Sequence, residues 1–381
     1  MKGRAVQPFA KKDFRAAIVR QKGGPFVIET ASITPPRHDE VLVRVVATGM
    51  CHTDMVARDQ VYPVPQPIVL GHEGAGVVEA VGENVTKVQK GDHVVLTFHS
   101  CGACRPCQEG HPAYCENFNA YNFAGARPGD GSHALCGHDQ TQLNDRFFGQ
   151  SSFGAYAIAN ERNVVKVRKD APLELLGPLG CGIQTGAGTV LNALKVGPGS
   201  SFAAFGAGAV GLSGVMAAAA AGATTIFAVD VVPSRLELAL ELGATHVVNS
   251  AKDDPVDAIR AVTGKGVDFA LDSTGIPAVI RNAVLALRPN GSAAIVGASK
   301  PGAVLDLDAN DLMQNVKSIR GVVEGDSVPD VFIPRLIDLH LAGRFPFDRL
   351  VKFYDLDQIN EAAADSEKGG TLKPIIRIGT T

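Results

Sequence analysis

Four cysteines lie within fifteen residues of this chain, at a spacing that could hold a metal ion. They begin in the segment CGACRPC and comprise Cys101, Cys104, Cys107 and Cys115. Four thiolates on a loop interrupted by glycine and proline suit tetrahedral zinc, and a shell closed by four sulfurs is typical of a structural site. The spacing therefore predicts a structural zinc. An iron–sulfur cluster remains the alternative, although Cys115 is followed by Glu116 rather than by the proline of a ferredoxin-type run.

Other roles fit the cysteines less well. The chain has seven cysteines, and an odd count argues against a disulfide framework. The reducing cytoplasm, which we infer below, argues against it as well. A third cysteine at the same spacing argues against a thioredoxin-like redox pair. Cys136 and His138 stand apart from the four, and we interpret them as a loop cysteine and an exposed histidine rather than as metal ligands.

A second group of residues could bind a dinucleotide. The segment FGAGAVG supplies G-x-G-x-x-G at Gly206, Gly208 and Gly211, between an apolar run and a helical run of small residues. The first glycine permits the tight turn, the second lets the backbone approach the pyrophosphate, and the third lets helix and strand close up. Asp230 lies 19 residues beyond Gly211 and would accept hydrogen bonds from the adenosine ribose. Because its charge would repel a 2′-phosphate, it favours NAD over NADP. Arg235 would lie along that ribose or in solvent.

Three further residues could bind a metal if the fold brought them together. They are Cys51, His72 and Cys181, which are spread over about 130 residues. Taken singly, a cysteine is more typical of a core, and a histidine is more typical of a satisfied core or surface position. The residue types alone therefore leave a ligand role open.

The elements that would carry these residues change in character along the chain. Residues 14–48, 68–85 and 155–167 read as short β-rich runs broken by glycine and proline, as in a barrel-like fold with tight corners. Residues 60–67 hold three prolines and predict a loop. Residues 92–150 lack a strong period, and a lobe held by zinc would explain how such a stretch is ordered.

The pattern becomes regular near residue 183. From there to about residue 325, helical stretches alternate with short β-rich stretches, which predicts six strands in a doubly wound parallel sheet. The tail beyond 325 returns to mixed segments, so we expect it to rejoin the first domain. The sequence therefore predicts an α/β protein with two domains, as its 381 residues also favour.

Composition argues against several classes of partner. A content of 45% hydrophobic and 20% charged residues is typical of a globular protein, and a net charge of -3 gives no support for binding to nucleic acid or an anionic membrane. The longest apolar stretch is too short to span a membrane. The N-terminus is basic but lacks the pattern of a signal peptide. We therefore expect a cytoplasmic protein that binds neither nucleic acid nor membrane.

A longer motif links these observations to a family. The segment GHEGAGVVEAVGENV matches the zinc alcohol dehydrogenase signature G-H-E-x2-G-x5-G-x2-V at every fixed position, and the cysteine cluster and glycine motif stand where that family has them. From about residue 14 the chain resembles the zinc-dependent medium-chain alcohol dehydrogenases. The segment CHTDMVARDQVYPVPQPIVLGHEG looks most like the bacterial aryl-alcohol (benzyl alcohol) branch. The resemblance implies a GroES-like β-rich catalytic domain over residues 1–183 and 325–381, and a Rossmann domain over residues 184–324.

The resemblance also implies a catalytic zinc beside the structural one. Cys51, His72 and Cys181 would bind it and leave a fourth position for water or substrate. Asp54 would orient His72, and Glu73 would lie just behind the metal.

Oxidation of an alcohol would follow from these parts. The zinc lowers the pKa of the alcohol, Thr53 would hydrogen-bond the substrate hydroxyl, and hydride would pass to the nicotinamide of NAD. The nicotinamide amide would lie near Val296 to Ala298, and Lys373 would reach the pyrophosphate. The expected cofactor contacts are His52, Gly206, Gly208, Gly211, Asp230, Arg235, Val296 and Lys373.

Two positions depart from the family pattern. Val56 stands where many members have the last histidine of a proton relay, so our hypothesis is that the proton leaves Thr53 through the ribose directly to water, helped by Arg58. His52 stands where many members have an arginine on the pyrophosphate. Because histidine carries less positive charge at neutral pH, this predicts looser and pH-dependent NADH binding.

The substrate is inferred from aromatic residues near the positions that line the pocket in the family. These side chains would form an aromatic wall, which suits a benzylic ring. They are Tyr62, Phe98, Phe147 and Phe148. We therefore expect oxidation of a primary, aromatic alcohol to the aldehyde by a homodimer or homotetramer, with the segment SIRGVVEG as a candidate pairing edge.

Other functions remain open at this point. A glutathione-dependent formaldehyde dehydrogenase or a general aliphatic alcohol dehydrogenase would use the same zinc site. A quinone or enoyl reductase would use the same fold without zinc. The non-enzymatic alternative is a dinucleotide-binding structural protein.

Overall fold

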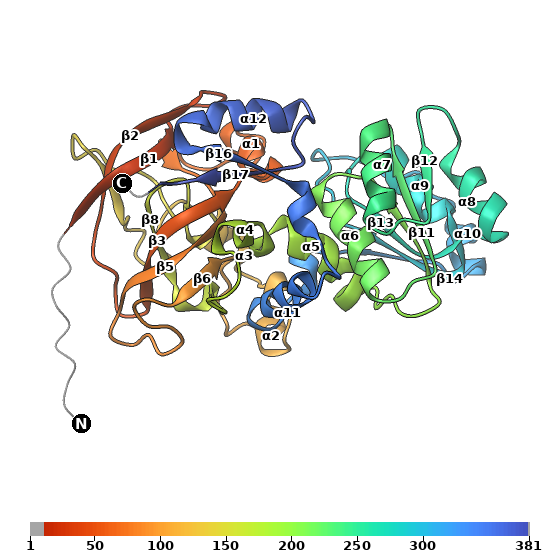
Figure 1. Ribbon diagram of the computed structural model, residues 1–381, viewed down its shortest axis with the longest axis horizontal. Coiled ribbons are helices and arrows are strands. Elements are labelled where there is room, and N and C mark those ends of the chain that lie inside the picture. The colour runs from red at the N-terminus through yellow and green to blue at the C-terminus, as the bar shows by residue number, and fades with distance from the viewer. Residues whose placement is uncertain (1–10, 380–381) are drawn as a thin grey trace. The chain divides into compact units, whose positions relative to one another are not determined.

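The computed structural model describes residues 11–379, and these form two compact units (Figure 1). Among the described residues, no helix is both long and apolar enough to cross a membrane. The first unit contains residues 11–108, 115–180 and 351–379, and the second contains residues 109–114 and 181–350.

The first unit is built on two β-sheets, as the β-rich sequence predicts. The four-stranded sheet has the order β4 (Ile68–Val69), β1 (Lys12–Val19), β2 (Phe26–Ile33) and β7 (Leu135–Gly137). The seven-stranded sheet has the order β16 (Val351–Asp355), β17 (Lys373–Arg377), β3 (Glu40–Gly49), β5 (Glu73–Val81), β6 (His93–Leu96) and β9 (Val164–Val167), and β8 (Tyr156–Asn160) also pairs with β3. All pairs of neighbouring strands are antiparallel except β16 with β17.

Strand β3 is the centre of the larger sheet. Its sequence, EVLVRVVATG, is rich in β-branched residues, and most of its side chains are buried because it pairs with β5, β8 and β17. Cys136 lies in β7 and not in a loop, so that part of our interpretation was wrong. Its position alternates with buried Leu135 and Gly137, a strand pattern too short to recognise in the sequence. The neighbouring His138 is exposed, as predicted.

The helices of the first unit are short apart from one near the C-terminus. Helix α12 buries Ile359, Ala362 and Ala363, and it lies against β16 and β17 (Figure 1). The α-helices of this unit are α1 (His52–Arg58), α2 (Arg105–Gln108), α3 (Phe118–Asn122), α4 (Leu173–Leu176) and α12 (Ile359–Glu367).

The second unit contains the predicted six-stranded parallel sheet. Its strand order begins at β12 and reverses direction at β10 and β13, which is the switch point of a doubly wound fold. The order is β12 (His246–Asn249), β11 (Thr225–Asp230), β10 (Ser201–Phe205), β13 (Val267–Asp272), β14 (Leu287–Ile295) and β15 (Ser318–Gly321). Strand β15, which carries the first half of SIRGVVEG, is the last strand of the sheet, as expected of an edge.

Helices alternate with these strands. Four of them begin with proline at the first turn, where its missing N–H costs no hydrogen bond. The helices of this unit are α5 (Gly182–Gly188), α6 (Ala209–Ala220), α7 (Pro233–Glu241), α8 (Pro255–Thr263), α9 (Pro277–Leu285), α10 (Ala309–Gln314) and α11 (Pro329–Leu341).

Residues 325–350 belong to this second unit, whereas we expected them in the catalytic domain. Helix α11 buries Phe332, Ile333 and Leu336 and contacts α5, and Arg349 forms an ion pair with Glu241 of α7. A mixed sequence pattern could not show this, because the apolar face of α11 does not indicate which helix it packs against.

Candidate active site

The pairing of β3 with β5 brings two predicted metal ligands together. In this antiparallel register Gly49 pairs with Glu73. Cys51 lies two residues beyond Gly49 and His72 lies one residue before Glu73, so both ligands stand at the same end of the strand pair. Position 49 must be glycine, since a Cβ there would lie 2.0 Å from a carboxylate oxygen of Glu73.

Asp54 fixes the orientation of both ligand segments. It is fully buried in the first turn of α1, and its Oδ2 accepts a hydrogen bond from the backbone N–H of Cys51 at 2.9 Å. Its Oδ1 lies 3.0 Å from the backbone nitrogen of Gly71 and 3.0 Å from Nδ1 of His72. A carboxylate at Nδ1 holds the proton there and leaves Nε2 as the free electron-pair donor. The predicted role of Asp54 therefore agrees with its contacts.

The unsatisfied nitrogen of His72 marks a position for a metal. Nε2 is buried and has no hydrogen-bond partner within residues 11–379. Cys51, His72, Glu73 and Cys181 each offer one ligand atom, and these atoms all lie within 4.8 Å of one another. Two sulfurs and an imidazole nitrogen are the donors that a catalytic zinc takes, so the residues fit the ion that the sequence predicts. Thr53 lies beside them, with Oγ1 3.7 Å from the sulfur of Cys51.

Glu73, the fourth member of this group, is held by a buried lysine. The Nζ of Lys373 on β17 lies 2.8 Å and 3.0 Å from the two carboxylate oxygens of Glu73, and it also donates to the carbonyl oxygen of Met50 at 3.4 Å. Glu73 is fully buried and Lys373 is 2% exposed. Burial raises the pKa of the Glu73 carboxyl, and the ammonium of Lys373 partly opposes this. The position argues against our expectation that Lys373 reaches a cofactor pyrophosphate.

A strained segment, residues 146–151, clamps the backbone around His72. Arg146, Phe148 and Ser151 all have positive φ values, of 70°, 51° and 53°, a conformation that non-glycine residues rarely adopt. Between them, Gln150 is 2% exposed. Its side-chain oxygen accepts from the backbone N–H of Gly74 at 3.1 Å, and its amide nitrogen donates to the carbonyl oxygen of His72 at 2.9 Å. No sequence pattern indicated a role for Gln150, because a glutamine that becomes buried looks like any polar loop residue.

Replacing Gln150 with leucine should therefore weaken zinc binding at the His72 site. Leucine keeps the volume but leaves the polar backbone groups of His72 and Gly74 unpaired, and outer groups of this kind typically change metal affinity by about 10–100-fold. Release of zinc to a chromogenic chelator would measure the effect, with the exposed Gln21→Ala variant as control. Equal rates of zinc loss in the two variants would contradict the assigned role.

Aromatic side chains surround the ring of His72. Phe148 stacks on it with a centroid distance of 4.5 Å, and Phe147 meets it edge-on at 5.4 Å. Tyr62 and Phe98 lie further out. Within residues 11–379 their ring contacts to the same cluster run through Phe123 and Phe118, which sequence reasoning missed. A cavity of about 470 Å³ is lined by Tyr62, Pro63, Asn119 and Phe123.

The four-cysteine cluster forms a second set of metal ligands. The sulfurs of Cys101, Cys104, Cys107 and Cys115 all lie within 4.8 Å of one another, and none forms a disulfide. Burial raises the pKa of the Cys101 thiol, but the backbone N–H groups of Ala103 and Cys104 point at its sulfur and bring the pKa down to about 6. These N–H groups favour the thiolate form that a metal requires.

The second unit carries the predicted dinucleotide motif at the carboxyl ends of β10 and β11. Gly206 has φ +96°, and a Cβ at Gly211 would lie 1.8 Å from the carbonyl oxygen of Gly206, so both positions require glycine. A Cβ at Gly208, the N-cap of α6, would meet nothing within 4 Å. Open space at a helix N-terminus is what a diphosphate needs. Val296 lies just beyond β14 in the same unit, and its backbone N–H donates to Asp272 at 2.9 Å.

Asp230 ends β11 as expected of a ribose-binding carboxylate. Its Oδ2 accepts from the backbone N–H of Ala207 at 2.7 Å, and its Oδ1 accepts from Val231 and Val232 at 2.8 Å and 2.9 Å. Arg235 lies 3.9 Å from Oδ2. His52, in the first unit, is exposed at the start of α1.

Comparison with known proteins agrees with this arrangement. The model of the alcohol dehydrogenase GroES-like domain matches residues 37–169, and that of the zinc-binding dehydrogenase matches residues 209–340. A solved benzyl alcohol dehydrogenase from Acinetobacter calcoaceticus is 57% identical, with a TM-score of 0.94, and the match covers 97% of this chain and 100% of that one. A solved alcohol dehydrogenase zinc-binding domain protein from Burkholderia ambifaria is 62% identical, with a TM-score of 0.96 and the same coverage.

A relative with a different named substrate is also similar. Geraniol dehydrogenase from Castellaniella defragrans is 50% identical over 363 residues, which are 95% of this chain and 97% of that protein. The matches confirm the fold class and the resemblance inferred from the sequence. This chain is therefore a member of the zinc-dependent medium-chain alcohol dehydrogenases, a family that uses NAD together with a catalytic and a structural zinc.

Proposed function

We propose that this enzyme oxidises a primary alcohol whose carbinol carbon adjoins an aromatic ring or a double bond, with transfer of hydride to NAD. The observation that carries the proposal is the aromatic cluster packed on His72. Phe148 stacks on the imidazole ring of His72, and Phe123 packs against Phe148 and lines the cavity beside Tyr62. Aromatic walls favour flat, unsaturated groups through offset and edge contacts. Benzyl alcohol and geraniol, named for two relatives, both carry such a group.

The chain's own residues account for most of the required positioning. Cys51, His72 and Cys181 would hold the zinc, which when bound lowers the pKa of an alcohol enough for an alkoxide to form near neutral pH. Asp54 keeps the proton of His72 on Nδ1, and Lys373 neutralises Glu73. The ring of Phe148 shields the imidazole from water.

Thr53 is the proposed first acceptor of the hydroxyl proton. Its hydroxyl lies beside Cys51, and Val56, three residues further along α1, cannot carry a proton onward. The proposed route therefore leads from Thr53 through the ribose of NAD to water. Arg58, which we expected to assist, is engaged by Asp59 and Glu367.

A comparison of alcohols tests the proposed substrate class. Initial rates of NADH formation would be measured with benzyl alcohol, cinnamyl alcohol and geraniol, and then with ethanol and with formaldehyde plus glutathione. We expect kcat/KM for the unsaturated alcohols to exceed that for ethanol by at least about 100-fold, which corresponds to a few kcal/mol of added apolar contact. Phe123→Leu should reduce this preference, whereas Phe353→Leu should not. A higher kcat/KM with ethanol, or activity only with glutathione present, would contradict the proposal.

The choice of NAD over NADP is proposed to depend on the charge of Asp230. Asp230→Asn keeps one side-chain oxygen, which can accept either from Val231 and Val232 or from Ala207, and it removes the charge that would repel a 2′-phosphate. We expect the ratio of kcat/KM for NADP to that for NAD to rise about tenfold, equivalent to about 1.4 kcal/mol. Steady-state rates with both cofactors measure it, and Asp254→Asn, at the N-cap of α8, is the control. An unchanged ratio would contradict the assignment.

We further propose that the enzyme acts in the cytoplasm as a homodimer or homotetramer. The exposed end of the sheet at β15 supports such pairing, since an edge strand has unused backbone hydrogen-bonding groups. Analytical ultracentrifugation of the purified protein would measure its oligomeric state directly.

A further inference from the structure

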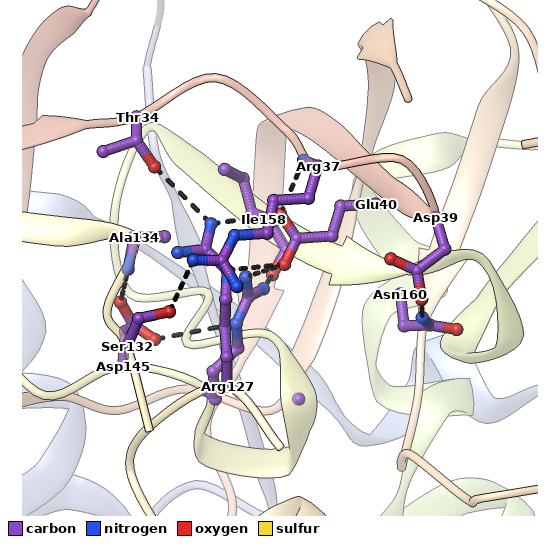
Figure 2. Close-up of polar contacts among 12 residues, drawn as sticks. Thr34, Arg37, Asp39, Glu40, Arg127, Ser132, Ala134, Asp145, Ile158 and Asn160 are labelled. Atoms are coloured by element: carbon purple, nitrogen blue, oxygen red, sulfur yellow. Dashed lines mark hydrogen bonds and ion pairs between the residues drawn. The ribbon is translucent and has the colours of Figure 1, made fainter. Parts of the chain in front are cut away.

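We propose that the first unit binds a small oxyanion in a cavity that borders the four-cysteine cluster at Cys101 and includes no residue of the catalytic cluster or the dinucleotide motif. The cavity has a volume of about 430 Å³ and is lined by residues from several loops, including four arginines. Figure 2 shows the polar contacts along one side of it. The four arginines are Arg37, Arg127, Arg146 and Arg162.

Two of the arginines form a buried base for the cavity. Arg127 and Arg146 are 6% and 5% exposed. Arg127 donates to the carboxylate of Glu40 (Figure 2), and Arg146 donates to the same carboxylate. Asp145 lies on the far side of Arg146, at 3.6 Å. Burial lowers the pKa of the Arg146 guanidinium, and these two carboxylates oppose that shift. The base is therefore a compensated ionic network whose guanidinium groups are already hydrogen-bonded to Glu40, although Oδ1 of Asp145 has no hydrogen-bond partner among the described residues. It shapes the cavity without being the anion's main ligand.

The hydrogen-bond donors that have no partner in the described structure lie on the remaining wall of the cavity. His99 is only 6% exposed, yet neither of its ring nitrogens has a hydrogen-bond partner in the part of the chain that the structure describes. The ring lines the cavity, so a molecule bound there would supply the missing hydrogen-bond partner. Tyr121 packs edge-on against His99 at 4.6 Å, and its hydroxyl also has no partner among the described residues.

Arg162 supplies the charge at the cavity mouth. Its Nε donates to the carbonyl oxygen of Ser100 at 3.0 Å, which fixes the guanidinium. Its two terminal nitrogens form no hydrogen bond or ion pair within residues 11–379. A fixed guanidinium with both terminal nitrogens available is the group that binds phosphate and carboxylate in a two-point contact. With His99 and Tyr121, it gives the cavity three kinds of unused hydrogen-bond donor.

Cationic and anionic groups both line the cavity around His99. Arg146 and Arg162 are cationic, and Cys101 of the four-cysteine cluster lies in the same lining. The cavity also contains two carboxylates near its rim, but each is occupied: Asp39 accepts from Asn160 (Figure 2), and Glu161 accepts from the backbone N–H groups at positions 86 and 87. An anion beside His99 and Arg162 would therefore find N–H donors without displacing an existing contact, and Arg162 would supply the attractive charge.

Nuclear magnetic resonance of the zinc-loaded protein with 15N-labelled histidine tests the site directly. Inorganic phosphate and acetate would be added in separate titrations, each against sodium chloride at equal ionic strength, with the His99 signals assigned from His99→Gln. We expect saturable movement of the His99 signals with phosphate. A similar response to acetate would show that the cavity binds carboxylates as well. A response to phosphate alone would restrict the bound anions to the phosphate type.

Variants connect the response to the proposed donors. Arg162→Gln should raise the apparent dissociation constant about tenfold, the effect of losing a charge-assisted contact of about 1.4 kcal/mol. Tyr121→Phe should raise it by less, and Arg335→Gln, which removes an exposed arginine on α11, should leave it unchanged. No saturable movement with either anion, or equal dissociation constants in wild type and Arg162→Gln, would overturn the proposal.

Discussion

Cys181→Ser should leave one zinc per chain and almost no alcohol oxidation. Cys181 is one of the residues whose ligand atoms lie within 4.8 Å of one another around the free Nε2 of His72, so its loss opens the catalytic site and leaves the four-cysteine site intact. Loss of a group that only supports a metal ligand typically lowers metal affinity or activity by about 10–100-fold. Loss of a ligand itself should lower them by more than that. Metal analysis of the dialysed protein and steady-state rates measure the two consequences separately.

Cys136→Ser is the matched control for this experiment. Cys136, like Cys181, forms no disulfide in the described structure, but it lies on β7 and belongs to neither metal cluster. We expect two zinc ions and normal rates in this variant. Retention of both ions and full turnover by Cys181→Ser would contradict the assignment of the catalytic site.

Lys373→Met should strongly destabilise the first unit. Methionine fills the space of the lysine but leaves the carboxylate of Glu73 buried without its partner, which typically costs about 3–5 kcal/mol. The added change Glu73→Gln removes that charge, so the double variant should recover part of the loss. Urea unfolding of the zinc-loaded proteins measures these differences in free energy. Lys352→Met, which breaks an exposed pair with Asp365, should have little effect.

The loss in Lys373→Met should also depend on pH. Burial already raises the pKa of Glu73, and removing Lys373 takes away the main opposing charge, so the pKa rises further. The native state then binds a proton that the unfolded state releases above the ordinary carboxyl pKa, and stability falls as pH increases through that window. The gap between variant and wild type should therefore widen from pH 5 to pH 8. A gap that is constant over this range would contradict a buried, unpaired carboxyl.

Local motifs predicted most of what could be learned from the sequence. The glycines of the dinucleotide motif and the four-cysteine cluster lie within short segments, so their spacing carries their geometry. Cys51, His72 and Cys181 do not, and only the family resemblance linked them. Their convergence depends partly on the pairing of Gly49 with Glu73, a register that no short pattern encodes.

The residues whose surroundings were not predicted from the sequence share a physical cause. Lys373 was expected at a pyrophosphate because a basic residue near the C-terminus is common there, but β17 carries it into the sheet interior beside Glu73. Gln150 and Phe123 act through partners that are distant in sequence. A side chain's environment is set by the tertiary fold, whereas the sequence around it mainly reports local conformation.

The two metal clusters differ in how far apart their ligands lie along the chain, so we expect them to fill in a fixed order. The four thiols from Cys101 to Cys115 need only a short loop to close, so we expect them to capture their ion while the rest of the polypeptide is still unfolded. Cys51 and His72 meet once β3 and β5 have paired, and Cys181 must join them from much further along the chain. We therefore expect occupancy of the second ion to report that these segments have come together, and a newly made chain with a single ion to be an incompletely folded enzyme rather than a damaged one.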